Sequence, residues 1–361
     1  MKYKALVIFT ILFVTLFTLA TVAASDVNDT DAVSEVTDDI TQDVDILKAT
    51  DTQIEENNSI LNVADEDTLS ADEGSFRDLQ DLINGAEEGS TIYLDKDYAF
   101  KNTATVEFSK SITIDGRGHY LDGKGKDRIF DIELGKQKHV FLNNITFKNG
   151  DVTWTSGGAI RCVSEQGNEA SLDIVDCTFD NNHADDGGAI YAEYVRTNIL
   201  NCRFTNNAAD DHGGAIEFDV RESTIRNCHF EDNKAKDYGG AIYFTEHDGD
   251  PRERYSRSND VRDSTFISNQ GDYGGAIYTN GCHNEMTNCY FYKNHANTDG
   301  GAIYAYAPVN GNDGVFQCVF LENSAEDDGG AIYAREYYPR IRYSVFDKNT
   351  AEVGKDAYMQ F

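Results

Sequence analysis

The sequence has few basic residues. Its 361 residues include 31 lysines and arginines against 63 aspartates and glutamates, which gives a formal charge of −32 at neutral pH. Nucleic acids are polyanions, and proteins bind them through lysine and arginine contacts to phosphates, so this composition argues against nucleic acid as a partner. Cations, or surfaces that present cations, are the expected partners instead.

Aromatic residues are absent from residues 25–74, where acidic side chains are frequent and Lys48 is the single basic residue. Such a segment cannot bury enough apolar surface to fold, and we interpret it as a disordered acidic linker. Residues 1–24 combine Lys2 and Lys4 with an apolar run that ends in small residues, which is typical of a cleaved secretory signal peptide. An uncleaved anchor is the alternative, because about 20 apolar residues can span a bilayer. We expect export, with the membrane involved only through this segment if it is uncleaved.

A disulfide framework is not indicated, although an exported chain with seven cysteines invites one. Five cysteines stand two residues before a phenylalanine, and serine takes the same place in two further repeats. A position that accepts either residue once per repeat is a small, buried core position. The cysteines are Cys177, Cys202, Cys228, Cys289 and Cys318, and the serines are Ser264 and Ser344.

Helical periodicity is absent from the part of the chain that repeats. Self-similarity at a spacing of 20 to 50 residues is the mark of a solenoid. Short segments such as residues 177–179 and 189–192 alternate in the manner of strands, and about 26 residues per turn suits a parallel β-helix better than a leucine-rich or propeller unit. The repeat is marked by Phe179, Phe204, Phe230, Phe266, Phe291, Phe320 and Phe346.

Two further features recur in each repeat, an asparagine three residues after the phenylalanine and a glycine pair. Stacked coils superpose equivalent residues about 4.8 Å apart, so the asparagine amides can form a hydrogen-bonded ladder inside a turn. The glycines supply backbone angles that other residues resist and allow close approach of the next coil. The asparagines are Asn182, Asn207, Asn233, Asn269, Asn294, Asn323 and Asn349, and the pairs begin at Gly157, Gly187, Gly213, Gly239, Gly274, Gly300 and Gly329.

The two ends of the solenoid need cover. Residues 76–83 place Phe76, Leu79, Leu82 and Ile83 on one helical face, so we predict a short N-terminal helix that caps the first coil. At the other end the last repeat is degenerate. We expect that residues 345–361, or a partner chain, cover the exposed edge there.

The paired signatures F-x-x-N and G-G-A-I, as in "FDNNHADDGGAI" at residues 179–190, resemble those of the chlamydial polymorphic outer-membrane proteins and of the adhesin-like surface proteins of methanogenic archaea. The resemblance covers about residues 75–361 and implies a right-handed parallel β-helix, the pectin-lyase-like solenoid, displayed outside the cell. It suggests adhesion. The chain departs from the chlamydial pattern in lacking a C-terminal translocator barrel, which favours simple secretion or anchoring by the N-terminus.

A column of carboxylates is expected two residues before the glycine pairs. Coils in register place these side chains about 4.8 Å apart, where they repel unless cations relieve them. Calcium, which takes six to eight oxygen ligands, is the natural cation, although no cofactor is required by the fold. A solvated acidic corner with loosely held cations is the alternative. The column consists of Asp185, Asp211, Asp237, Asp272 and Asp327.

A tyrosine follows the G-G-A-I signature in most coils and points outward, with Glu217 interrupting the row. Tyrosine presents apolar area with a polar tip, so an accessible row could stack on sugars or anchor a protein partner. A self-stacking ladder that stiffens the sheet is the alternative. The predicted binding row consists of Tyr191, Tyr243, Tyr278, Tyr304 and Tyr333.

An enzymatic alternative follows from the fold, which polysaccharide lyases share. A lyase needs a cation to neutralise a uronate carboxylate and a base near the acidic proton of the sugar. Arg196 and Arg221 are the candidates for the base, with the aspartate column holding calcium. Active sites usually break a repeat in one place, whereas these carboxylates recur in every coil.

The one long insertion spans residues 245–263 and is rich in arginine. Long loops on repeat scaffolds tend to carry function, so Arg252, Arg254 and Arg257 are candidate contacts for an anionic partner, with a charge-compensated loop as the alternative. The corner histidines His183, His212 and His295 share no metal-ligand spacing, and we interpret them as surface residues.

The sequence therefore predicts an extracellular, cell-surface β-helix. Its expected function is non-enzymatic and adhesin-like, with a cell-surface protein or a polysaccharide as the partner. A calcium-dependent polysaccharide lyase is the alternative.

Overall fold

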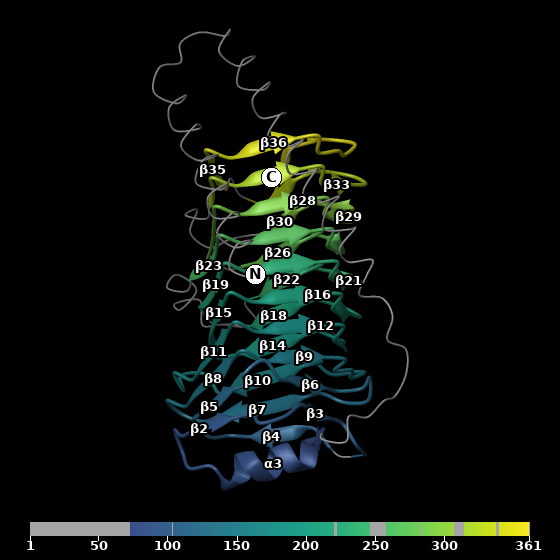
Figure 1. Cartoon of the computed structure of the whole chain (residues 1–361). Coiled ribbons are helices and arrows are strands. Elements are labelled where there is room, and N and C mark those ends of the chain that lie inside the picture. Colours follow the sequence, from purple (N-terminus) through teal and green to yellow (C-terminus); the bar gives the residue numbers. More distant parts are fainter. Residues whose placement is uncertain are drawn as a thin grey trace, which may run out of the picture. The chain divides into compact units, whose positions relative to one another are not determined.

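The computed structural model describes residues 73–102, 104–219, 222–245, 258–281, 283–306, 314–336 and 339–360. Arg221, Arg252, Arg254 and Arg257 lie outside these ranges. The described residues from Glu73 onward form a stack of coils, with helix α3 (Phe76–Gly85) at its N-terminal end (Figure 1). No helix in the described ranges is long and apolar enough to cross a membrane.

Sheet A has eleven strands and carries the phenylalanine of each repeat. Its strands are β1 (Gly74–Ser75), β3 (Tyr98–Ala99), β6 (Tyr120–Asp122), β9 (Thr146–Lys148), β12 (Thr178–Asp180), β16 (Arg203–Thr205), β20 (His229–Glu231), β24 (Thr265–Ile267), β28 (Tyr290–Tyr292), β32 (Val319–Leu321) and β36 (Val345–Asp347). Sheet B has ten strands and precedes sheet A in each coil. Its strands are β2 (Thr91–Tyr93), β5 (Ile112–Asp115), β8 (His139–Asn143), β11 (Ser171–Val175), β15 (Arg196–Leu200), β19 (Ser223–Arg226), β23 (Ser258–Arg262), β27 (His283–Thr287), β31 (Gly314–Phe316) and β35 (Arg340–Arg342).

Sheet C has ten strands, seven of which follow a glycine pair. Its strands are β4 (Val106–Phe108), β7 (Phe130–Leu134), β10 (Ile160–Ser164), β14 (Ile190–Glu193), β18 (Ile216–Asp219), β22 (Ile242–Thr245), β26 (Ile277–Asn280), β30 (Ile303–Tyr306), β34 (Ile332–Arg335) and β37 (Ala357–Gln360). Sheet D has six short strands between sheets A and C. Its strands are β13 (His183–Ala184), β17 (Ala208–Ala209), β21 (Lys234–Ala235), β25 (Gln270–Tyr273), β29 (His295–Asp299) and β33 (Ser324–Ala325).

The coils from β11 to β34 visit the sheets in the order B, A, D, C, as β11, β12, β13 and β14 do, and the last coil passes from sheet A to sheet C without a strand in sheet D. All strand pairs in the described residues are parallel, with Phe179 opposite Phe204 and Ile190 opposite Ile216. The predicted fold, an all-β right-handed parallel β-helix with very little helix, is confirmed. Each strand pairs in register with the equivalent strand of the next coil, so equivalent side chains of the repeat form columns.

The core is filled by such columns. The phenylalanine rings stack face to face from Phe147 to Phe346, with centroids 4.7 to 4.9 Å apart. The cysteines at the small core position are buried and free, and the backbone N–H of Cys177 points to the sulfur of Cys202 at 3.4 Å. Where serine stands in this position, Oγ of Ser264 accepts a hydrogen bond from the backbone N–H of Cys228 at 3.1 Å. The interpretation of this position as a small, buried core site is therefore confirmed.

The asparagines form the predicted ladder. Oδ1 of Asn233 accepts hydrogen bonds from the backbone N–H and the side-chain amide of Asn207, at 3.1 and 2.9 Å. Its own amide donates to Oδ1 of Asn269 and to the carbonyl of Phe204, at 2.9 and 3.0 Å. Asn233 is fully buried, so these bonds satisfy a side chain that water cannot reach.

The glycine pairs close the coil in two different ways. The first glycine of a pair adopts a left-handed conformation, with φ of 60° at Gly213. The second lies against the next coil, because a Cβ added at Gly214 would meet the carbonyl oxygen of Gly240 at 2.1 Å. A Cβ at Gly213 would also meet the carbonyl oxygen of Ile216 at 2.3 Å, so both residues must be glycine, the first for the tight turn and the second for contact between coils.

Helix α3 caps the first coils as predicted. Ser75 is its N-cap and exchanges hydrogen bonds with Asp78 in a capping box. Phe76, Leu79 and Ile83 are fully buried in the core, whereas Leu82 is 39 % exposed. The helix thus covers the open end of the coil stack with one apolar face.

Candidate functional site

The tyrosine row lies on the outer face of sheet C, in register from Tyr191 through Glu217 to Tyr243 and onward. Most of its rings are not accessible, although Tyr191 is only partly buried. Tyr243, Tyr278, Tyr304 and Tyr333 are only 3 to 8 % exposed, and they form an apolar cluster separate from the main core. The expectation of an accessible binding row is wrong in this respect, because further tyrosines cover it. Tyr238, Tyr273 and Tyr306 pack against the buried row, and Tyr358 continues the row by one coil beyond Tyr333.

The tyrosines pack against one another along the row. The rings of Tyr278 and Tyr304 are parallel within 5°, with centroids 4.8 Å apart, and Tyr304 lies 4.7 Å from Tyr333. Burial raises the pKa of Tyr278, and the neighbouring phenols add to the effect. This geometry is that of a self-stacking ladder that stiffens sheet C, the alternative considered from the sequence.

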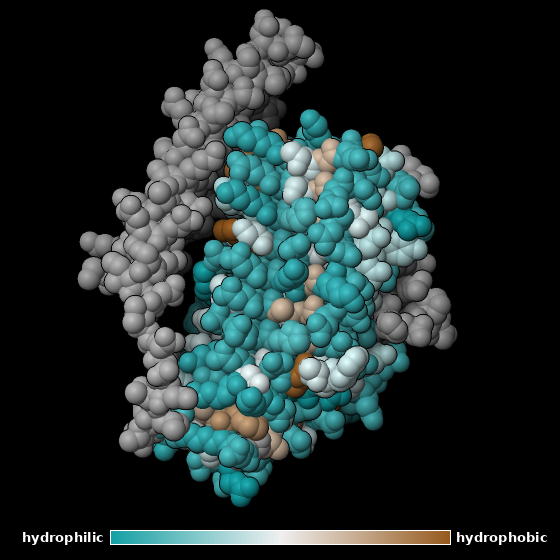
Figure 2. Space-filling model, turned by 90° about the vertical axis from the view of Figure 1, so that its right-hand side faces the viewer, coloured by the Kyte–Doolittle hydropathy of each residue, from teal (hydrophilic) through white to brown (hydrophobic). Residues whose placement is uncertain are grey.

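The carboxylates of the repeat form a column, as predicted. The backbone N–H of Asp211 donates to the carbonyl of Asp185 at 2.8 Å, and that of Asp237 donates to Asp211 at 2.9 Å. Burial, followed by the charge of Asp186 and then Asp211, raises the pKa of Asp185. The side of the solenoid that carries sheet D is mostly hydrophilic, with small apolar areas (Figure 2). Calcium binding by this column stays a prediction.

A polar cluster lies where the tyrosine ladder begins. Asp186, His212 and Glu217 each place one carboxylate oxygen or ring nitrogen within 4.8 Å of the others. Nδ1 of His212 is 3.1 Å from Oδ1 of Asp186. On its other side the His212 ring stacks on Tyr238 at 4.9 Å and 11°. The imidazole is thereby held between the aromatic ladder and the two carboxylates.

Glu217 is the unusual member of this cluster. It occupies a tyrosine position in sheet C, is only 6 % exposed, and its Oε2 has no hydrogen-bond partner. Burial raises the pKa of Glu217 well above its usual value, and the charges of Asp186 and Asp219 raise it further. A buried carboxylate without a donor is costly unless a proton or a cation neutralises it.

A second group of possible ligands shares His212 and adds two members of the carboxylate column, Asp211 and Asp237. His212, interpreted from the sequence as a surface residue, is thus part of both groups of possible ligands. Sequence spacing could not reveal the cluster, because its members come from neighbouring coils that stack in register. The one signal in the sequence was Glu217, which interrupts the tyrosine row.

The residues proposed for a lyase are not brought together among the described residues. Arg196 begins β15 and is 58 % exposed in its side chain, with Glu222 at 3.4 Å as an ion-pair partner. Asp185 precedes β14 and Arg196 follows it, so a strand of four residues, about 13 Å long, separates the two positions. A base and a cation that act on one sugar would have to lie closer together.

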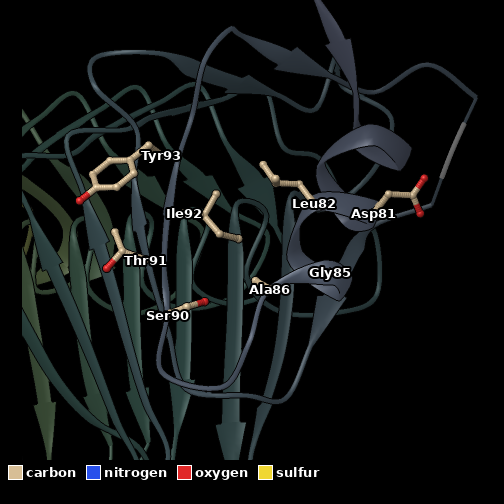
Figure 3. Close-up of a pocket in the computed structure, with 8 residues that line it drawn as sticks. All are labelled: Asp81, Leu82, Gly85, Ala86, Ser90, Thr91, Ile92 and Tyr93. Atoms are coloured by element: carbon tan, nitrogen blue, oxygen red, sulfur yellow. The ribbon is translucent and has the colours of Figure 1, made fainter.

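Two exposed apolar features stand out on the described surface. Trp154 is 90 % exposed on the segment before β10, and the next residue, Thr155, accepts the backbone hydrogen bond of Asp185. An open hollow of about 480 Å³ lies between α3 and β2, lined by Leu82, Ile92 and Tyr93 among others (Figure 3). The hollow offers one carboxylate, Asp81, and one phenol, Tyr93, which lie on opposite sides of it (Figure 3).

Comparison with known families matches two parts of the chain. Residues 100–271 match the model of the right-handed beta helix region. Residues 263–280, 288–306 and 317–335 match the Chlamydia polymorphic membrane protein repeat. No curated protein and no solved structure matches the chain significantly. The resemblance to the chlamydial polymorphic outer-membrane proteins is confirmed, and the chain combines a right-handed β-helix region with repeats of the polymorphic membrane protein type.

Proposed function

We propose that the protein is exported and displayed at the cell surface, where the outer faces of its coils bind a cell-surface protein or a polysaccharide. The repeats of the polymorphic membrane protein type support surface display. The observation that carries the proposal is the strict register of the coils, which presents the same side chains at one coil spacing over the whole stack. Such a surface suits an extended or repetitive partner.

Trp154 is the side chain that we expect to contribute most to this binding. A large aromatic side chain exposed to solvent is a common energetic centre of interfaces and stacks well on sugar rings. It lies beside the start of the carboxylate column, so a partner with apolar faces and cationic or hydroxyl groups would contact both. The buried tyrosines act as scaffold in this proposal.

The test is retention of the full-length chain on whole cells and on polysaccharides of differing charge. Replacement of Trp154 by Ala should weaken binding about tenfold or more. Leu200→Ala, which removes an exposed apolar side chain from sheet B, is the matched control and should leave binding unchanged. Equal binding by both variants would rule out the Trp154 face.

The lyase alternative is tested on the same samples, with calcium present, by following the ultraviolet absorbance of unsaturated uronate products. We expect no increase in absorbance. An increase that is lost on Arg196→Ala would make the protein an enzyme and overturn the proposal.

A further inference from the structure

The polar cluster at the start of the tyrosine ladder has a property that the carboxylate column lacks. Two of its carboxylate oxygens, Oε2 of Glu217 and Oδ1 of Asp186, are buried and accept no hydrogen bond. The His212 nitrogen is close to Asp186, at 3.1 Å, but its alignment does not make a hydrogen bond to that oxygen. Each of the three side chains therefore directs a ligand atom toward the same small region.

The surroundings keep these side chains in place. Gly187 donates its backbone N–H to the carbonyl of His212 at 2.8 Å, which fixes the turn that carries the imidazole. Glu217 lies in strand β18 between Tyr191 and Tyr243, so its backbone is held by the sheet on both sides. A site built on strands in register changes little when a ligand enters.

From Tyr191 to Tyr358, all the other described coils hold tyrosine at the Glu217 position, and from Tyr243 onward these rings pack against one another. Glutamate at position 217 loses the packing of a tyrosine ring and introduces a buried negative charge next to Asp186 and Asp219. Both effects destabilise the coil unless something positive occupies the space. A bound cation accounts for all three observations: the substitution, the burial and the missing donors.

We propose that Asp186, His212 and Glu217 bind a divalent transition-metal ion, with Zn²⁺ as the ion that best fits two carboxylates and one imidazole. Nitrogen ligands suit zinc and related metals, whereas calcium and magnesium take oxygen ligands. Three protein ligands leave a further coordination position for water. The site is independent of the proposed surface binding and would stabilise the coil at which the aromatic ladder starts.

The first experiment measures zinc binding and thermal stability of the metal-free full-length chain. We expect one equivalent of Zn²⁺ to bind tightly. We also expect a rise in Tm of about 5 °C at a hundredfold excess over the dissociation constant. Calcium at the same concentration should not displace the zinc. An unchanged Tm with no stoichiometric binding, or equal displacement by calcium, would overturn the proposal.

The informative variant is Glu217→Tyr, which restores the residue of the repeat. It should fold at least as well as the metal-free wild type and lose the zinc-dependent rise in Tm. His183→Asn is the matched control, because His183 also faces two carboxylates, Asp151 at 3.0 Å and Asp210 at 3.4 Å, without forming part of the cluster. Zinc binding that survives Glu217→Tyr would show that the ligands lie elsewhere.

The visible absorption of bound Co²⁺ tests metal ligation directly. A purely structural role of Glu217 would give no such absorption. Co²⁺ bound by one nitrogen and two oxygen ligands should produce visible absorption bands in the wild type and in His183→Asn. The bands should disappear in His212→Asn. Their persistence in His212→Asn would contradict ligation by this imidazole.

Discussion

At the residue scale, the buried asparagine column shows how one side chain can hold a turn between two coils. Within the column, as at Asn233, Oδ1 accepts two hydrogen bonds from the preceding asparagine, and the side-chain amide donates both to the next asparagine and to a phenylalanine carbonyl. No other side chain of this size offers an acceptor and two donors in one plane. The turn therefore needs asparagine at this position.

Replacement of Asn233 by Ala should lower the free energy of unfolding by about 1 to 3 kcal/mol, because the buried N–H and amide of Asn207 lose their acceptor. Denaturant unfolding followed by circular dichroism measures this change. Lys234→Ala, at the exposed neighbouring position, is the control and should have little effect. An unfolding midpoint that stays the same in Asn233→Ala would remove the ladder as a source of stability.

The raised pKa of Asp299 predicts that the stability of the folded protein depends on pH. Burial raises the pKa of this carboxyl to about 6, and the charges of Asp328 and Asp327 contribute, although the backbone N–H of Asp328 donates to it and opposes the shift. The folded state therefore holds the proton to higher pH than the unfolded state, and its stability falls as the pH rises from about 4 through 6.

Asp299→Asn keeps the acceptor and removes the charge, so its Tm should equal that of the wild type near pH 4 and exceed it near pH 7. Thermal unfolding across this pH range measures the difference. Asp347→Asn, at a residue 3.6 Å from Lys348, controls for the loss of one negative charge. A constant difference in Tm between Asp299→Asn and the wild type at all pH values would contradict the raised pKa.

At the element scale, the positions of helix α3 and of the repeating strands could be predicted from the sequence, whereas the exposure of the tyrosines on the strands could not. The helix follows from four apolar residues on one face, and three of them are indeed buried. The strands of sheets A and C follow from repetition, because each phenylalanine and glycine pair recurs at a fixed place in the coil. The accessibility of the tyrosines could not be predicted, since part of their cover comes from Tyr238 and Tyr273, at a position that holds aspartate or histidine in other coils.

Helix α3 should be required for the stability of the first coils. Leu79→Ala should lower the free energy of unfolding by about 2 to 5 kcal/mol, because Leu79 is fully buried against the core. Leu82→Ala, one turn further along on the same helix and 39 % exposed, is the matched control, with an expected change of about 0.5 kcal/mol or less. Denaturant unfolding compares the two.

Hydrogen exchange shows which coils lose stability when Leu79 is replaced. In Leu79→Ala, faster exchange should be confined to the coils next to α3, such as β2 and β4, because each coil of a solenoid contacts only its neighbours. Equal losses of stability in Leu79→Ala and Leu82→Ala would show that the helix does not cap the core.

At the scale of the whole molecule, the repeat that makes the solenoid regular also concentrates its charge. Equivalent carboxylates recur coil after coil, and the chain carries a formal charge of −32. Self-repulsion of this kind destabilises a compact state and weakens when salt screens it. The buried columns of phenylalanine and asparagine must therefore hold together a surface that repels itself.

The Tm should accordingly rise when NaCl is increased from about 0.01 to 1 M, since the screening length falls from about 30 to 3 Å. CaCl₂ at matched ionic strength separates general screening from binding. If the Tm rises more in CaCl₂ than in NaCl, and the double variant Asp272→Asn/Asp327→Asn loses this difference, the carboxylate column binds calcium. If the Tm rises equally in both salts, the cations form only a diffuse layer around the column. These two aspartates lie in coils beyond His212, so the comparison does not involve the proposed zinc site. A Tm that does not rise with NaCl would mean that repulsion along the column has no measurable effect on stability.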